Sequence, residues 1–169
     1  MQVQQAPAEP ACPSVRKMRA SDMDAVLSLL DEANMVPVAP SAEIPEPEVS
    51  ELVVEHTFVA EIGTEVVGVA SYFVHSRTAC ETGSFAVRRR MRGRGIGYLL
   101  QCARLQEMKA RGMTRVITQT DIPANIEWFV RRFGYTKVGR NMKRHSFGDP
   151  AIDHWIVLEL DLASWHADP

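Results

Sequence analysis

Alternating apolar and polar positions in the first half of the chain predict a series of β-strands. Four segments are rich in β-branched and aromatic residues and have the period of a strand: residues 15–19, 56–62, 65–74 and 78–87. A Gly63-Thr64 turn joins the second segment to the third, so these two form a hairpin, and the first strands follow one another in antiparallel succession. Apolar residues at helical spacing predict a helix from residue 21 to about residue 33.

The connection between this helix and the hairpin contains four prolines, which interrupt regular structure. We expect an irregular stretch over residues 34–47 and a brief helix around residues 48–53.

The second half of the chain alternates helices and strands. A helix is predicted over residues 98–111, ended by Gly112, because apolar residues recur on one helical face at Ile96, Leu99, Leu100, Ala103 and Met108. The elements expected after it are a strand at 116–120, a helix at 125–135, a strand at 136–140, a polar loop at 141–153 and a strand at 155–162. The strand-helix-strand crossover around the first of these helices should join two parallel strands and be right-handed.

The composition fits one globular domain. The chain has 169 residues, of which 46% are hydrophobic, enough for the core of a single domain over residues 14–169. Residues 1–13 are rich in Gln, Ala and Pro and are predicted to form a flexible tail, not a signal peptide. No apolar stretch is long enough to span a membrane. Three cysteines without metal-binding spacing and scattered histidines predict a reducing cytoplasm and no metal site.

A glycine-rich turn joins the strand that ends at Val87 to the following helix. The first amides of a helix lack intrahelical acceptors, and the helix dipole adds positive potential there, so such a turn favours an anion. Glycines at 93, 95 and 97 let the backbone approach a phosphate closely. Five arginines lie between residues 88 and 94, and without them 14 basic side chains would face 21 acidic ones. The positive potential is therefore local, on the scale of a few phosphates.

Several other classes of phosphate-binding protein do not fit this turn. A P-loop requires Gly-Lys-Ser/Thr at the start of the helix, which is absent. The dinucleotide-binding fingerprint requires a third glycine where this chain has Tyr98. A protein that binds duplex nucleic acid would be basic overall, whereas the sequence pI is near 6.2.

The remaining pattern, Arg92-x-x-Gly95-x-Gly97 preceded by Phe85-Ala86-Val87, resembles the pyrophosphate loop of the GNAT superfamily of acyl-CoA-dependent N-acetyltransferases. A second segment, from Asn125 to Gly134-Tyr135, resembles the family helix that begins after an asparagine and closes on Gly-Phe or Gly-Tyr. The resemblance implies an α/β fold with a central mixed, mostly antiparallel sheet and helices on both faces.

The resemblance also implies a site for acetyl-CoA and no requirement for a metal. The loop would hold the pyrophosphate, the strand end would pair with the pantetheine arm as an added strand does, and the asparagine would contact the cofactor, unless it only caps its helix. The cofactor-binding residues implied in this way are Phe85, Ala86, Val87, Arg92, Gly93, Arg94, Gly95, Ile96, Gly97 and Asn125.

Glu81 is the candidate general base. In protein-acetylating members of the family a glutamate stands eleven residues before the first Arg or Gln of the loop, as Glu81 does here, and strand alternation would place it on the face of Phe85 and Val87. An exposed strand position is the alternative reading. The tyrosine that often protonates the leaving thiolate is replaced by Val130, so Tyr98, Tyr135 or water would substitute. We interpret Cys102 as a small buried apolar residue and not as a nucleophile.

These features predict an enzyme that moves an acetyl group from acetyl-CoA to a primary amine of a small molecule by direct attack. The alternatives are a protein or peptide acetyltransferase and a non-catalytic acyl-CoA-binding regulatory module. The acceptor site would lie beside residues 34–53 and 141–153, and acidic residues there would favour a cationic amine, although a solvated surface is the simpler explanation of Glu43, Glu46, Glu48 and Glu51. No nucleic acid or membrane partner is expected, and a homodimer would be in keeping with the family.

Overall fold

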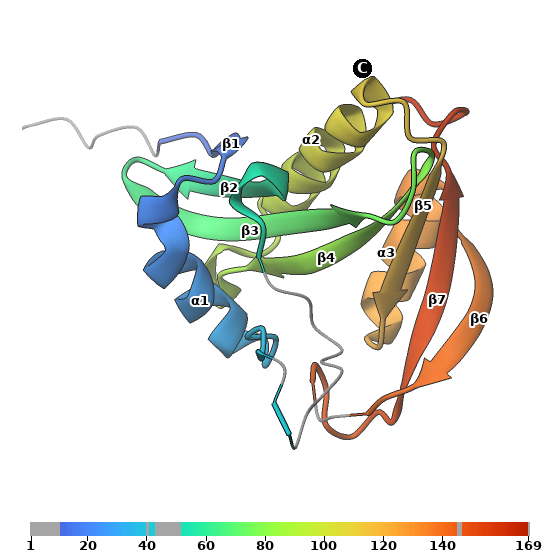
Figure 1. The fold of residues 1–169 in the computed structure, drawn as a ribbon. Coiled ribbons are helices and arrows are strands. Elements are labelled where there is room, and N and C mark those ends of the chain that lie inside the picture. Colours follow the sequence, from blue (N-terminus) through green and yellow to red (C-terminus); the bar gives the residue numbers. More distant parts are fainter. Residues whose placement is uncertain (1–10, 40, 43–51, 145–146, 169) are drawn as a thin grey trace, which may run out of the picture.

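The computed structural model describes residues 11–39, 41–42, 52–144 and 147–168 (Figure 1). Most of the predicted tail, the acidic residues Glu43, Glu46, Glu48 and Glu51, and residues 48–51 of the predicted brief helix lie outside this description. Leu52 and Val53 are not helical, and they precede a short 3-10 helix, η2 (Val54–His56).

One seven-stranded sheet forms the centre of the molecule, with the strand order β1-β2-β3-β4-β5-β7-β6 (Figure 1). Every neighbouring pair is antiparallel except β4 and β5, which are parallel, so the predicted mixed, mostly antiparallel sheet is confirmed. The strands are β1 (Ser14–Lys17), β2 (Thr57–Ile62), β3 (Glu65–Val74), β4 (Ala79–Val87), β5 (Arg115–Thr120), β6 (Thr136–Met142) and β7 (His154–Asp161).

Helices cover both faces of the sheet, as predicted. The helix α1 (Met23–Glu32) packs on β3 and β4 from one side, and α2 (Ile96–Ala110) packs on β1 to β4 from the other. The helix α3 (Pro123–Phe133) contributes its buried phenylalanines to the same core as α2. Short 3-10 helices precede α1, at η1 (Ala20–Asp22), and α2, at η3 (Arg89–Met91). No helix in the described part of the chain is long and apolar enough to cross a membrane.

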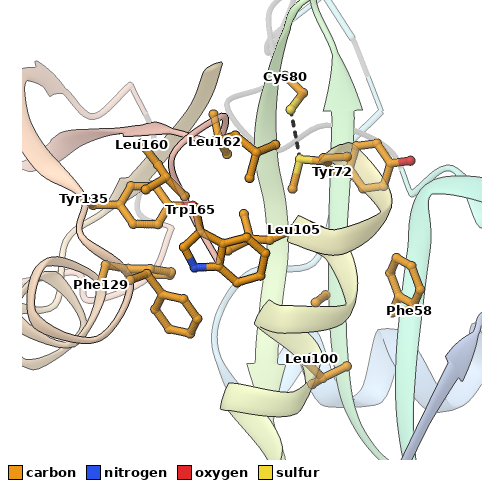
Figure 2. Packing of buried hydrophobic residues seen from close by; sticks show 14 of the residues in the cluster. Phe58, Tyr72, Cys80, Leu100, Leu105, Phe129, Tyr135, Leu160, Leu162 and Trp165 are labelled. Carbon is orange, nitrogen blue, oxygen red and sulfur yellow. Dashed lines mark hydrogen bonds between the residues drawn. The ribbon is translucent and has the colours of Figure 1, made fainter. Parts of the chain in front are cut away.

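The larger core lies between α2, α3 and the sheet. Figure 2 shows Leu100 and Leu105 of α2 among aromatic residues of the strands, of α3 and of the segment after β7. The Cys80 thiol points to the Met108 sulfur, 2.9 Å away. The buried face of α2 differs from the predicted one: Leu99 is 39% exposed, and two polar side chains take buried positions instead, Gln101 and Arg104. These two residues bear on the site described below.

Gly68 sets how closely α2 approaches the sheet. This residue lies on β3 opposite Val87, and a Cβ atom there would stand 2.8 Å from Leu100 Cδ1 and 3.3 Å from Ile96 Cγ2. Because real side chains do not approach so closely, any larger residue would displace the Leu100 and Ile96 side chains or push the first turns of α2 outward. The glycine therefore fixes the position of the helix start that follows the glycine-rich turn.

We predict that Gly68→Ala destabilises the protein by roughly 1–3 kcal/mol through overpacking beneath α2, measured by urea denaturation. Gly139→Ala is the matched control, because a Cβ atom on that strand glycine meets no atom within 4 Å. Adding Leu100→Ala to Gly68→Ala should cost less than the sum of the two single changes, since it removes the clashing methyl groups. An unchanged midpoint for Gly68→Ala would show that α2 is not held so close to β3.

Candidate active site

The strands β4 and β5 are paired over only part of their length. Their parallel ladder joins Ala79–Glu81 to Arg115–Ile117 and stops there. Figure 1 shows the two strands diverging beyond this point. The edge of β4 that faces β5 therefore has no strand partner from Thr82 to Val87. We call the point where the two strands part the apex. It consists of the last paired residues, Glu81 and Ile117, and of the residues that follow them, Thr82 and Thr118.

The backbone of the β4 end is turned toward this open edge. Arg88 N donates to Val67 O at 2.8 Å, which makes the neighbouring pair, Val87 opposite Gly68, a pair that exchanges no hydrogen bonds. The Val87 amide and carbonyl therefore point away from β3, as do those of Phe85 by the period of the strand. The Val87 carbonyl accepts a hydrogen bond from Arg92 Nε at 3.2 Å.

A β-bulge in β4 changes which face its side chains occupy. Phe85 pairs with Ala70 but Thr82 pairs with Tyr72, so β4 has one residue more than β3 in this interval. Phe85 and Val87 face α2, since a side chain on Gly97 would come within 3.4 Å of the Phe85 ring.

Before the bulge, the thiol of Cys80 also faces α2, where it contacts Met108. Glu81 consequently lies on the opposite face from Phe85 and Val87. The prediction that strand alternation places all three on one face was wrong, because the extra residue of the bulge reverses the alternation.

Glu81 lies at the apex among polar side chains on the α1 side of the sheet. Its Oε2 atom is 2.8 Å from His75 Nε2, and its Oε1 accepts from Gln119 Nε2 at 2.8 Å. Gln119 Oε1 in turn accepts from Asn141 Nδ2 at 2.9 Å. Side chains of β4, β5 and β6 thus form one row of hydrogen bonds. The Glu81 side chain is 15% exposed and that of His75 46%, so the carboxylate is sheltered but connected to solvent through the imidazole.

The glycine-rich turn has the backbone geometry of an anion site. Gly93 and Gly95 adopt left-handed φ angles of 76° and 77°, which glycine alone adopts without strain. Gly95 caps α2, which begins at Ile96, two residues before the predicted start. The amides of the first turn, including those of Ile96 and Gly97, have no intrahelical acceptor and project toward the turn.

Ion pairs divide the arginine cluster of this turn. Arg88 Nη1 bonds to Glu32 Oε1 at 2.6 Å, and Arg90 bonds to Glu65, so the charges of these two are neutralised locally. Arg89, Arg92 and Arg94 are exposed, and none of their side chains forms an ion pair with any residue that the structure describes. Two of these three uncompensated charges, those of Arg92 and Arg94, lie nearest the start of α2.

Asn125 lies in the first turn of α3 and does not cap it. The N-cap residue is Ile122, followed by Pro123, and the Asn125 amide bonds to Ile122 O at 3.0 Å. The alternative that Asn125 serves as a helix cap was therefore wrong. Within the described part of the chain its half-buried side chain forms no hydrogen bond, which leaves the amide free for a ligand.

The groups considered for the leaving thiolate and for covalent catalysis have different surroundings. Tyr135 is 1% exposed and accepts a hydrogen bond from Gln101 Nε2 at 3.1 Å, whereas Tyr98 stacks on Phe133 at 5.6 Å between ring centroids. Val130 packs against the larger core. Burial raises the pKa of the Cys102 thiol, which disfavours the thiolate that a nucleophile needs.

Sequence reasoning missed several polar residues of this region. His75, Gln119 and Asn141 become neighbours of Glu81 only through the strand order, so the sequence gives no local sign of them. Arg104 did leave a sign: it stands at helical spacing between Leu100 and Met108, in the middle of an apolar face.

The sequence also matches a family model. The model of the Acetyltransferase (GNAT) family matches residues 24–135, which include β4, the glycine-rich turn, α2 and α3. The chain belongs to this family. Membership confirms the predicted family and fold class, and with them an acyltransferase that uses acetyl-CoA. A search of curated proteins finds no match to the chain.

Solved structures share the fold at low identity. Rv2747 from Mycobacterium tuberculosis, in complex with CoA, is 23% identical with a TM-score of 0.65, covering 88% of this chain and 98% of that one. N-acetylglutamate synthase from Neisseria gonorrhoeae, complexed with coenzyme A and N-acetyl-glutamate, is 16% identical with a TM-score of 0.67, covering 92% and 36%. The ribosomal-protein-S18-alanine N-acetyltransferase from Escherichia coli is 15% identical with a TM-score of 0.67, covering 89% and 94%.

We predict that Arg94→Ala weakens acetyl-CoA binding about tenfold or more, because a charge-assisted bond to phosphate contributes roughly 1.5–3 kcal/mol. Arg90→Ala removes the same charge from the same turn but from an arginine already paired with Glu65, so its effect should be several-fold smaller. Calorimetric titration of both variants makes the comparison. Equal losses would mean that the turn acts only through its total charge.

Proposed function

We propose that this GNAT protein transfers the acetyl group of acetyl-CoA to a primary amine of a small molecule by direct nucleophilic attack. The observation that carries the proposal is the free edge of β4, which runs from the apex to a glycine-rich turn at the start of α2. A strand edge and a helix start joined in this way offer consecutive sites for an extended amide-containing arm and for a pyrophosphate.

The dimensions of this edge suit the pantetheine arm. Its chain of bonds from pyrophosphate to sulfur is about as long as four extended residues, or roughly 14 Å. Counted from Val87 along β4, four residues lead to Gly83, beside the apex. With the pyrophosphate at Arg92, Arg94 and the first amides of α2, the thioester would lie between the bulge and the apex. The complexes of two structural neighbours with CoA support an acyl-CoA ligand on this fold.

A contact between two loops supports a small acceptor. Gly148 N donates to Asn34 O at 3.0 Å, and Asn34 Nδ2 donates to Gly148 O at 3.2 Å. Beside them Phe147 and Trp155 form a small apolar cluster against which Met35 and Val38 pack. We call these joined segments, residues 34–38 and 147–155, the strap. It links the connection after α1 to the loop before β7, which restricts the space for a long peptide on this side.

A buried lysine anchors the strap. Lys143 Nζ donates to Asp121 Oδ2 at 2.8 Å and to the carbonyl oxygens of Phe147 at 2.8 Å and Asp149 at 2.9 Å. The side chains of Lys143 and Asp121 are each 5% exposed, so breaking this pair would leave an unpaired buried charge. The strap is therefore a fixed part of the fold and suits a site of defined size.

Direct attack is favoured over a covalent relay by the state of the thiols. Burial raises the pKa of Cys80 to about 12 and also raises that of Cys102, so neither provides a thiolate near neutral pH. The acceptor amine must itself attack the thioester, and an aliphatic ammonium has to lose a proton before it can do so.

Glu81 is our candidate for the base that removes this proton. Its carboxylate lies at the apex, next to the place where the thioester would end, and on the face that the strap borders. His75 offers a path by which the proton would reach solvent, because it bonds to Glu81 and is itself nearly half exposed. Gln119 holds the other oxygen of Glu81 and so fixes the orientation of the carboxylate.

An acceptor screen tests the proposed function. Acetyl-CoA would be incubated with the protein and with panels of small amines and of peptides, and products would be identified by mass spectrometry. We expect acetylated small amines together with release of CoA thiol. Acetylation of peptides alone would favour the protein-acetylating alternative. Tight binding of acetyl-CoA with no acceptor-dependent thiol release would favour a non-catalytic acyl-CoA-binding module.

We predict that Glu81→Gln lowers turnover near neutral pH by roughly 10²–10⁴-fold while acetyl-CoA affinity stays the same, because the variant cannot accept a proton. Turnover should recover as pH rises toward the pKa of the amine, where the neutral amine becomes abundant. Glu159→Gln is the control, since this carboxylate lies on β7, which β5 separates from β4, and pairs with Arg115. Wild-type turnover of Glu81→Gln at every pH would remove the residue from the mechanism.

A further inference from the structure

The row of hydrogen bonds that ends on Glu81 can run in only one direction. An ionised carboxylate only accepts, so the Gln119 atom that lies 2.8 Å from Glu81 Oε1 must be the amide nitrogen, Nε2. The amide oxygen of Gln119 then faces Asn141, and because this oxygen also only accepts, Asn141 must present its Nδ2, 2.9 Å away. Both bonds therefore donate toward the carboxylate, and Asn141 is the first donor of the row.

Asn141 lies far from Glu81 in the sheet and packs in no core. It belongs to β6, whose seven residues are all exposed, and β5 and β7 lie between this strand and β4. Asn141 pairs with Trp155 of β7 whereas Gln119 pairs with Val157, so the bond between them crosses β7 diagonally. Within the part of the chain that the structure describes, this is the one hydrogen bond of the Asn141 side chain. What the position contributes is therefore its contact with Gln119.

The two oxygens of Glu81 have different surroundings. Oε1 accepts from Gln119, and Oε2 lies 2.8 Å from His75 Nε2 on the side of an imidazole that is nearly half exposed. A donor at Oε1 stabilises the ionised form of the carboxyl group relative to the protonated form. When acetyl-CoA and the acceptor exclude water from the apex, the carboxylate loses solvation, but the bond from Gln119 remains.

We propose that Asn141 is a positioning residue that acts through Gln119: it holds the amide nitrogen of Gln119 toward Glu81, so that the carboxylate stays ionised and oriented toward the acceptor. This inference rests on the proposed function, in which Glu81 is the base. One N–H bond of the acceptor ammonium breaks, its proton goes to the Glu81 carboxylate, and the electron pair stays on nitrogen and attacks the thioester carbon. Gln119 and Asn141 neither gain nor lose a proton.

Substitution of Asn141 by aspartate would oppose the row. Asp has nearly the shape of Asn, but its carboxylate only accepts, so it competes with Glu81 for the amide nitrogen of Gln119. Whenever Gln119 turns to Asp, its oxygen faces Glu81, which then lacks a donor. Asn141→Ala leaves the Gln119 oxygen to water and its nitrogen on Glu81. We therefore expect Asp to be worse than Ala, whereas a residue that only fills space would tolerate Asp better.

Other charged groups beside Glu81 are the same in both variants, so they cannot account for a difference between Asp and Ala. They are His75 and the exposed Arg77 in the segment before β4, and three ion pairs: Arg115 of β5 with Glu159 of β7, Glu32 of α1 with Arg88, and Lys143 with Asp121.

Carbon-13 NMR of the Glu81 carboxyl group, identified by the loss of its signal in Glu81→Gln, tests the proposal without any substrate. The pH at which Glu81 takes up its proton should differ little between the wild type and Asn141→Ala and be about one unit higher in Asn141→Asp. The added charge alone, three strand spacings of roughly 4.8 Å from β4, would account for only about 0.3 unit.

Met142→Asp is the matched control for charge. It adds the same carboxylate to the next residue of β6, on the opposite face of the strand, where the Met142 side chain is 63% exposed. Glu81 should titrate there within about 0.3 unit of the wild type. Equal shifts in Met142→Asp and Asn141→Asp, or no shift in either, would overturn the proposal.

A double variant tests whether Gln119 is the intermediary. Gln119→Leu removes the middle of the row and should by itself raise the titration of Glu81 by about one unit. Asn141→Asp added to Gln119→Leu should then change it by no more than about 0.3 unit, because the amide that Asp would turn is absent. Fully additive shifts would show that position 141 acts on Glu81 without Gln119, contrary to the proposal.

Turnover should carry the same signature. In Asn141→Asp the acid limb of the kcat profile should move up by about one pH unit at an unchanged KM for acetyl-CoA, and turnover should return to the wild-type level above that limb. Asn141→Ala should stay within about threefold of the wild type at every pH. A loss in Asn141→Asp that is the same at every pH would indicate a merely structural role.

The two levels of inference fail separately. A protein that transfers acetyl groups equally well as wild type and as Glu81→Gln would refute the proposed base, and the row would then have no part in catalysis. If Glu81→Gln is impaired but the Glu81 carboxyl titrates alike in the wild type and in Asn141→Asp, the base stands and the role of Asn141 alone is refuted.

Discussion

The parting of β4 from β5 after three paired residues is the constraint on which the rest of the site depends. An unpaired strand edge within a sheet is unusual, because its amides and carbonyls need partners. Here the sheet continues beyond the gap only because β5 pairs with β7 on its other side. The helix α2 then fills one side of the diverging strands, and its start lies at the far end of the free edge. The edge that we propose for acetyl-CoA is therefore a direct result of the strand order.

Much of the fold follows from local sequence signals, and the failures have a common origin. Strand and helix periods, the turn at Gly63 and the loop at Arg92 to Gly97 depend on neighbours in the chain, so they could be predicted. The bulge depends on pairing between two strands and reverses the face of Glu81. Gly83 was the available sign in the sequence, since a glycine inside a strand often marks a bulge. In the structure, a Cβ atom added at this position would lie 2.5 Å from Ser71 Oγ.

Polar residues of the site were harder to foresee because tertiary contacts define them. Arg104 occupies a position where helical periodicity asks for an apolar residue, and only the packed structure shows the carbonyl and amide oxygens that accept its hydrogen bonds. Asn141 reaches Gln119 although β7 separates their strands in the sheet. A charged residue on the apolar face of a helix can be recognised in a sequence, whereas its hydrogen-bond partners are known only once the strand order is known.

The strap also bears on the order in which the two halves of the proposed site fold, the donor half for acetyl-CoA and the acceptor half. The edge of β4, the turn and α2 come from one continuous stretch of chain, whereas the hydrogen bond between Asn34 and Gly148 joins residues 114 positions apart. Contacts between distant residues form slowly because a long loop has to close first. We therefore expect the donor half to be native-like while the acceptor side is still open. Newly made protein would then be able to hold its acyl donor before it has any selectivity for the amine.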